Sequence, residues 1–200
     1  MYSHKKDLAI EIRNGLFIAA SRSYAEQYIE PFIRAKYELT EPTSNDHDGI
    51  DKNGKRYEIK TSKVLRATGN SKILKTILDR ILYEVNNIET NRLVPFSQCL
   101  TAEYLANIQN VKRDHFDYLL YVLLFEDCVK VFSADRDSIK TGNFPSWSDK
   151  HGRYDEHGKS GQFPVTRSTI QWHLNRNLKD TVTYDEMTAA YIELSKQHAI

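Results

Sequence analysis

The chain has 200 residues, of which 40% are hydrophobic and 28% charged, and this composition predicts one folded domain over residues 1–200. No apolar run approaches the roughly 20 residues that a membrane helix needs, and no signal-peptide core follows the N-terminus, so we expect no membrane partner and a cytoplasmic location. The net charge of +1 gives no support to a nucleic-acid partner. Two cysteines without a CxxC pair argue against a disulfide framework or a zinc site.

Helical and strand patterns follow one another through the first half of the chain. Apolar residues recur at helical spacing over residues 17–37, where Pro31 is expected to kink or end the helix. Residues 41–47 are expected to form a polar loop, and residues 48–62 a hairpin. Residues 73–85 carry an apolar stripe typical of a helix, and this stripe suits a core position and a dimer interface equally well.

The middle of the chain predicts one more helix and two strands. The helix is expected to begin near Thr101 and to include Tyr104, Leu105 and Ile108. Residues 118–125 are a continuous apolar run, which is typical of a strand buried on both faces. A turn at Glu126 and Asp127 then leads to a second strand over residues 128–133.

The C-terminal part begins with a long polar stretch, residues 149–162, which predicts a functional surface loop. Residues 166–174 are expected to be helical. A capping box, in which Thr183 precedes Glu186 by three positions, marks the start of the last helix. This order of elements predicts an α/β fold of mixed α+β type, with a mixed β-sheet flanked by helices.

The chemically informative residues lie in the predicted hairpin, where Asn53-Gly54 is a strong turn signal. Because side chains alternate along a strand, Glu58 and Lys60 point to one side and Ile59 points into the core on the other. A carboxylate and an ammonium therefore stand next to each other on one face.

The turn type decides which aspartate joins them. A two-residue loop would place Gly49 opposite Glu58 and turn Asp48 to the other face. A three-residue loop with Gly54 in the left-handed region places Asp48 directly opposite Glu58. We favour Asp48, with Asp51 as the alternative.

Two facing carboxylates repel each other unless a cation lies between them, and oxygen ligands of this kind favour Mg²⁺. A bound metal would neutralise charge on a phosphate and activate water. Lys60 would then orient or deprotonate the water, or stabilise the transition state. The pattern therefore predicts phosphodiester hydrolysis with Asp48, Glu58 and Lys60 as catalytic residues. From Lys52 to Lys75 the chain has eight Lys or Arg residues and one acid, which agrees with a polyanionic substrate.

This segment resembles the PD-(D/E)xK nuclease superfamily, and within it the small dimeric type II restriction endonucleases. The matching positions are Asp48, Ile50, Asp51, Gly54, Tyr57, Glu58, Ile59 and Lys60, with a weaker match at Ser148, Asp149, His151, Pro164 and Val165. The resemblance implies a restriction-endonuclease-like fold and a homodimer that uses Mg²⁺ to cut both strands of double-stranded DNA at a short palindrome. It also implies that Asp48, Glu58 and the backbone carbonyl of Ile59 bind the metal, and that Lys60 is the catalytic lysine.

The chain departs from those enzymes at Asn45, where they have an acid, and over residues 64–95, which look like an insertion. Further DNA contacts are expected from polar side chains after the catalytic lysine and in the long loop. These candidates are Ser62, Lys63, Lys150, His151, Arg153, Lys159 and Gln162. An ordinary charged surface would carry the same residues.

Two other functions remain open. One is a repair or nicking nuclease of the same fold, acting as a monomer. The other is a non-catalytic DNA-binding module, with a helix over residues 166–178 as the reader.

Overall fold

The computed structural model describes residues 28–42, 44, 46–67, 92–140, 142–150 and 160–198, with residues 194–198 described by their backbone alone. The first half contains α3 (Glu30–Lys36), β1 (Gly49–Ile50), β2 (Arg56–Lys63), β3 (Leu65–Arg66), η3 (Phe96–Gln98), β4 (Tyr104–Val111) and η4 (Arg113–His115). The second half contains β5 (Tyr118–Leu124), β6 (Cys128–Asp135), η5 (Arg136–Ser138), β7 (Gly161–Thr166), α5 (Ile170–Arg176), β8 (Leu178–Thr183) and α6 (Tyr184–His198). The predicted helix over residues 73–85 lies outside the described residues.

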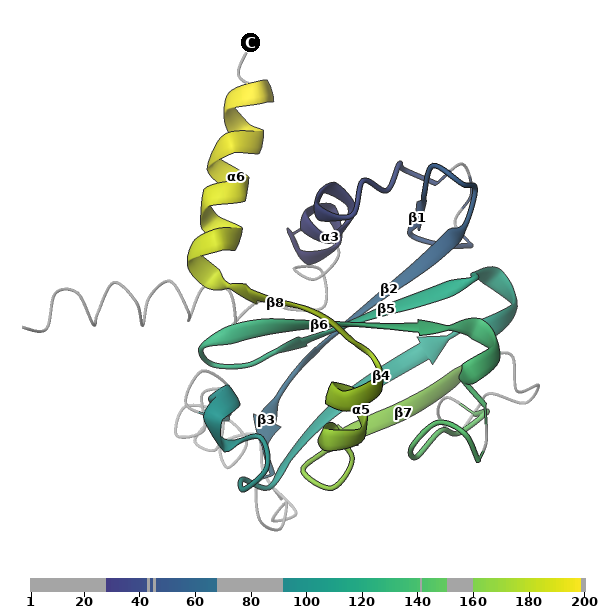
Figure 1. Cartoon of the computed structure of the whole chain (residues 1–200), viewed down its shortest axis with the longest axis vertical. Coiled ribbons are helices and arrows are strands. Elements are labelled where there is room, and N and C mark those ends of the chain that lie inside the picture. The colour runs from purple at the N-terminus through teal and green to yellow at the C-terminus, as the bar shows by residue number, and fades with distance from the viewer. Residues whose placement is uncertain are drawn as a thin grey trace, which may run out of the picture.

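The fold is mixed α/β, as predicted, but its strands form two sheets. A five-stranded sheet has the order β1-β2-β5-β6-β8, in which β2 and β5 are parallel and the other neighbours antiparallel. A three-stranded antiparallel sheet has the order β3-β4-β7. Figure 1 shows α3 and α6 over one face of the larger sheet, and β4, β7 and α5 on its other side.

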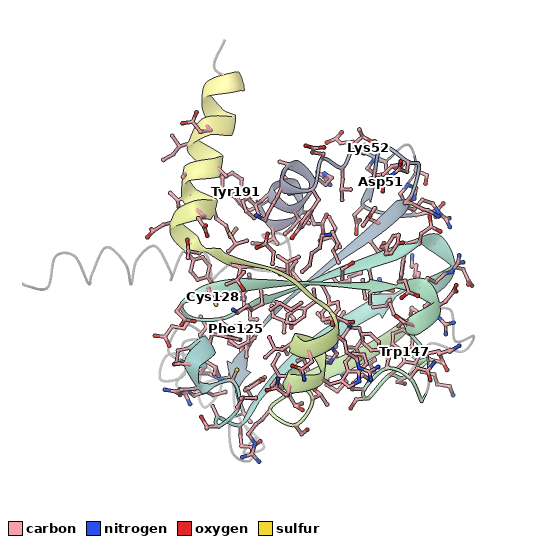
Figure 2. All side chains as sticks on the ribbon, in the orientation of Figure 1. Asp51, Lys52, Phe125, Cys128, Trp147 and Tyr191 are labelled. Atoms are coloured by element: carbon pink, nitrogen blue, oxygen red, sulfur yellow. The ribbon has the colours of Figure 1, made fainter. Side chains whose placement is uncertain are left out.

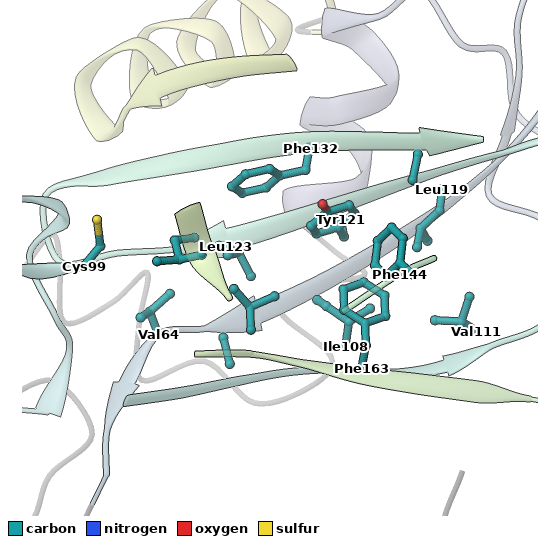
Figure 3. Close-up of a cluster of buried hydrophobic side chains, with 14 of the residues drawn as sticks. Val64, Cys99, Ile108, Val111, Leu119, Tyr121, Leu123, Phe132, Phe144 and Phe163 are labelled. Atoms are coloured by element: carbon teal, nitrogen blue, oxygen red, sulfur yellow. The ribbon is translucent and has the colours of Figure 1, made fainter. Parts of the chain in front are cut away.

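The central strand β5 contributes side chains to two hydrophobic cores. Three of its residues pack between the two sheets (Figure 3), namely Leu119, Tyr121 and Leu123. Three alternate residues pack against α3 and α6, namely Leu120, Val122 and Leu124. Because both faces are buried, the run of apolar residues is continuous. The predicted strands over residues 118–125 and 128–133 are confirmed.

The helix predicted near Thr101 is wrong, since residues 104–111 form β4. Tyr104, Ala106 and Ile108 are buried, whereas Leu105 is 50% exposed. This alternation has the two-residue period of a strand. The backbone of β4 pairs with β3 on one side and β7 on the other, and these distant partners outweigh the local helical spacing.

Two other predicted boundaries shift. Pro31 lies in the first turn of α3, where a missing N–H is tolerated, and a π-helical turn over residues 28–29 precedes it. The helix predicted over residues 166–174 is α5 (Ile170–Arg176), because Thr166 still pairs with β4 at the end of β7.

The capping box at the start of α6 is confirmed. The Glu186 N–H donates to Thr183 Oγ1 at 3.1 Å, and the Thr183 N–H donates to Glu186 Oε2 at 2.6 Å. These two bonds satisfy backbone donors that a helix start leaves free. None of the helices in the described ranges is long and apolar enough to cross a membrane.

A buried histidine joins α5 to the central sheet. Tyr121 Oη lies 2.8 Å from His173 Nδ1 and accepts a hydrogen bond from Asn177 Nδ2 at 2.9 Å. The donor in the first of these bonds depends on the tautomer of the His173 ring. Burial lowers the pKa of His173 to about 4.

This depressed pKa predicts a loss of stability in mild acid. The unfolded chain binds a proton to His173 below its usual pKa of about 6.5, but the folded chain does so only near 4. The stability that depends on a neutral His173 is therefore fully present above the unfolded pKa. It is lost as the pH falls through this window, by about 2 kcal/mol near pH 5. Denaturant unfolding should show that His173→Gln loses less stability between about pH 7.5 and about pH 5 than the wild type does. An equal loss in both proteins would contradict this role.

Candidate active site

The first hairpin brings Asp48 next to Glu58. β1 and β2 are antiparallel, and the paired residues are Gly49 with Tyr57 and Ile50 with Arg56. The regular pairing ends at Gly49, because the Asp48 N–H donates to the Tyr57 carbonyl at 2.8 Å and the Asp48 carboxylate accepts the Ile59 N–H at 2.7 Å. The Asp48 carboxylate therefore lies at the edge of β2 beside Glu58, whose pKa it raises.

The turn itself has the predicted form. The Gly54 N–H donates to the Asp51 carbonyl at 2.9 Å, the Asp51 N–H donates to the Lys55 carbonyl at 3.0 Å, and Gly54 has φ +76°. The Asp51 carboxylate accepts hydrogen bonds from the backbone of Asn53 at 2.8 Å and of Lys55 at 2.9 Å. Figure 2 labels Asp51 at this tip of the molecule. Asp51 therefore caps the turn, which leaves Asp48 as the aspartate of the site.

Asp48, Glu58 and Lys60 form one electrostatic cluster. Glu58 is 6% exposed, and its Oε1 forms an ion pair with Lys60 Nζ. Burial raises the pKa of the Glu58 carboxyl, the Lys60 ammonium acts against this rise, and the Asp48 carboxylate adds to it. Lys60 partly balances the repulsion between the buried Glu58 and the half-buried Asp48.

The backbone of Ile59 completes a possible metal site. Its N–H donates to Asp48 Oδ2 at 2.7 Å. Because the N–H and C=O of a strand residue lie on the same side, the Ile59 carbonyl also points to the edge where Asp48 lies. Two carboxylates and this carbonyl are an oxygen ligand set that suits Mg²⁺. Among the described residues no group of three or more His, Cys, Asp or Glu could hold a metal, so an ion here would need the carbonyl and further ligands from water or substrate.

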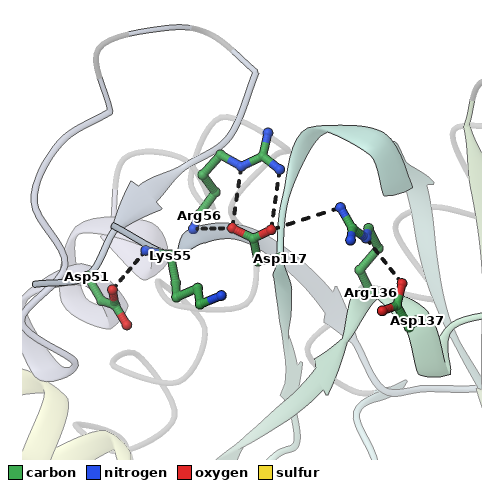
Figure 4. Close-up of polar contacts among 6 residues, drawn as sticks. All are labelled: Asp51, Lys55, Arg56, Asp117, Arg136 and Asp137. Atoms are coloured by element: carbon green, nitrogen blue, oxygen red, sulfur yellow. Dashed lines mark hydrogen bonds and ion pairs between the residues drawn. The ribbon is translucent and has the colours of Figure 1, made fainter. Parts of the chain in front are cut away.

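Two contacts hold the hairpin in place. At the start of β2, Asp117 accepts hydrogen bonds from the Arg56 N–H at 3.0 Å and from the Arg56 guanidinium at 3.3 and 3.4 Å (Figure 4). The backbone bond and the guanidinium both lower the pKa of Asp117. On the other strand, Arg34 of α3 donates to the Asp48 carbonyl at 3.4 Å.

Four of the seven expected DNA-contacting residues are described, and they lie in different parts of the fold. Strand alternation puts Ser62 on the face of Glu58 and Lys60 but Lys63 on the opposite face, so the structure does not support grouping Lys63 with Lys60. Lys150 is exposed, and Gln162 lies on β7 with its backbone paired to Ser148. Three of the candidates, His151, Arg153 and Lys159, lie outside the described residues.

One residue near the site was missed from the sequence. Lys112 directly follows β4, and its ammonium lowers the pKa of Glu58. No local pattern marks Lys112, because its position depends on the packing of β4 against β2, two strands that are far apart in sequence.

Searches against protein-family models and against curated proteins find no match to this chain. The interpretation of the site therefore depends on its geometry.

The hairpin geometry generates a prediction about Gly54. A Cβ at this position would meet no atom within 4 Å, so the left-handed backbone conformation is the only source of strain in Gly54→Ala. We expect it to destabilise the protein by about 1 kcal/mol, and Gly54→Asn to cost less because asparagine tolerates this conformation. Denaturant unfolding measures both variants, and equal stability of Gly54→Ala and wild type would show that the turn does not need glycine.

Proposed function

We propose that this protein is a Mg²⁺-dependent nuclease that hydrolyses phosphodiester bonds of double-stranded DNA. The observation that carries the proposal is the position of the Asp48 carboxylate at the edge of β2 next to the buried Glu58, with Lys60 paired to Glu58. In a hairpin with a purely structural role, a buried acid next to a second acid would lower the stability of the fold unless a cation offset their repulsion. Carboxyl groups whose pKa is raised by burial and by a neighbouring acid, as for Glu58, concentrate at functional sites.

The residues have separate tasks in this mechanism. Asp48, Glu58 and the Ile59 carbonyl would hold Mg²⁺, which when bound neutralises phosphate charge and makes water more acidic. Lys60, released in part from Glu58, directs its ammonium hydrogens at a phosphate oxygen and stabilises the negative charge that develops there. In the alternative role, a neutral Lys60 accepts a proton from the attacking water.

The more specific part of the proposal is a type II restriction endonuclease, located in the cytoplasm. Its support is the resemblance of residues 48–60 to that family, together with a symmetry argument. A two-fold homodimer presents two equal sites to the two strands of a palindrome, so each site cuts one strand. A monomeric repair or nicking nuclease on this fold is the second candidate.

The primary test is digestion of a supercoiled plasmid with Mg²⁺ by four proteins: wild type, Lys60→Ala, Glu58→Gln and the control Lys179→Ala. Lys179 lies on β8 with its ammonium over the Tyr37 ring, on the helix-covered side of the sheet. We expect cleavage by the wild type and the control, and a loss of at least about a hundredfold in both site variants while DNA binding is retained. Full activity of Lys60→Ala would remove Lys60 from the mechanism.

The cleavage pattern separates the two kinds of nuclease. Discrete linear fragments, with light scattering that shows a dimer, support a restriction endonuclease. Nicked circles from a monomer support a nicking or repair enzyme. Tight DNA binding without any cleavage supports a non-catalytic module instead.

A second prediction concerns the metal. Asp48→Asn keeps an oxygen that can accept the Ile59 N–H bond, but it removes the charge that opposes Glu58. We expect the variant to be at least as stable as the wild type in EDTA, because the repulsion is gone. Added Mg²⁺ should raise the Tm of the wild type, since a ligand that binds only the folded state stabilises it, and should leave the Tm of Asp48→Asn unchanged. An equal rise in both proteins would place the ion elsewhere.

A further inference from the structure

Lys112 is a cation held next to the candidate site by the second sheet. It directly follows β4, whose last residue, Val111, is buried and pairs with Gly161 of β7. β4 packs across β2, the strand that carries Glu58 and Lys60. Lys112 therefore reaches the site from the side of the three-stranded sheet, whereas Lys60 reaches it from the five-stranded sheet.

The backbone around Lys112 is fixed at both ends. Its carbonyl accepts a hydrogen bond from the His115 N–H at 3.0 Å, which closes the short helix η4. His115 Nδ1 lies 3.3 Å from a carboxylate oxygen of Asp46, two residues before Asp48. The segment from Lys112 to His115 thus runs beside the chain that leads into the site.

The side chain of Lys112 is exposed, and its ammonium is paired with no carboxylate among the described residues. The neighbouring cations differ in this respect, since Arg113 lies 3.7 Å from Asp149 and Lys60 is paired with Glu58. The turn that holds Lys112 lies beside the segment that leads to Asp48, and β4 packs against the strand that carries Glu58. A cation at this place, with no ion-pair partner in the described part of the chain, is suited to an anionic group of the substrate.

We infer that Lys112 is a substrate-positioning residue that binds a backbone phosphate of DNA from the side opposite Lys60. The inference rests on the proposed nuclease function and names a contact that the catalytic motif does not contain. Lys112 carries no sequence information in this role, because phosphate contacts fix the position of the duplex and do not read bases. Its removal therefore weakens binding to all sequences alike.

The test compares wild type with Lys112→Gln, Lys112→Arg and the control Lys179→Gln. Binding of a fluorescent mixed-sequence duplex in EDTA is measured by anisotropy over a series of KCl concentrations. Loss of one phosphate contact reduces the slope of log Kd against log salt by about 0.9. We expect this reduction in Lys112→Gln, and wild-type slopes in Lys112→Arg and Lys179→Gln. Plasmid cleavage with Mg²⁺ should show a rise in KM of about tenfold for Lys112→Gln with kcat little changed, which is the opposite of the loss expected for Lys60→Ala.

The outcomes separate this inference from the nuclease proposal. An unchanged slope and KM in Lys112→Gln overturn the inference, even where the wild type cuts DNA. A reduced slope in a protein that never cuts DNA supports the phosphate contact and overturns the nuclease. A wild type that binds no DNA overturns both.

Discussion

The alternation of side chains along β2 is the constraint on which the candidate site depends. Ile59 is buried against α3, so its two neighbours in the pleat, Glu58 and Lys60, must face the other way. The three-residue turn that ends at Gly54 and the pairing of β1 with β2 then bring Asp48 to the edge of β2, where its carboxylate accepts the Ile59 N–H beside Glu58. A shift of one residue in this pairing would separate the acids, whatever their spacing in the sequence.

The core on each side of the larger sheet makes this register rigid. β2 pairs in parallel with β5, the strand whose side chains fill both hydrophobic cores. Slippage of β2 would move Ile59 out of one core and bring Glu58 into it, and both changes are unfavourable. Asp117 adds a local restraint, because it binds the backbone and the guanidinium of Arg56 at the first residue of the strand. The site is therefore built next to β5, the most buried strand of the larger sheet.

The sequence predicted the elements whose signals are local. The Asn53-Gly54 turn, the apolar run of β5 and the capping box at Thr183 each lie within a few residues, and each is confirmed. The sequence did not predict β4, and it gave no sign of a separate three-stranded sheet, because those strands are stabilised by partners distant in the chain. For the same reason Asp48 and Glu58 could be placed near each other in advance, whereas the position of Lys112 could not be predicted. Its place beside the site is a product of packing between the sheets.

The two lysines near the acids differ in environment, and this difference fits them for different tasks. Lys60 is partly buried and paired with Glu58, so its charge acts at short range in a medium less polar than water, which strengthens electrostatic stabilisation of a transition state. Lys112 is exposed to solvent, where a single charge contributes modestly to affinity but still attracts a polyanion. In the proposed nuclease, the larger sheet would carry the catalytic residues and the smaller sheet would carry a phosphate contact. The short contact between Asp46 and His115 lies where the two meet.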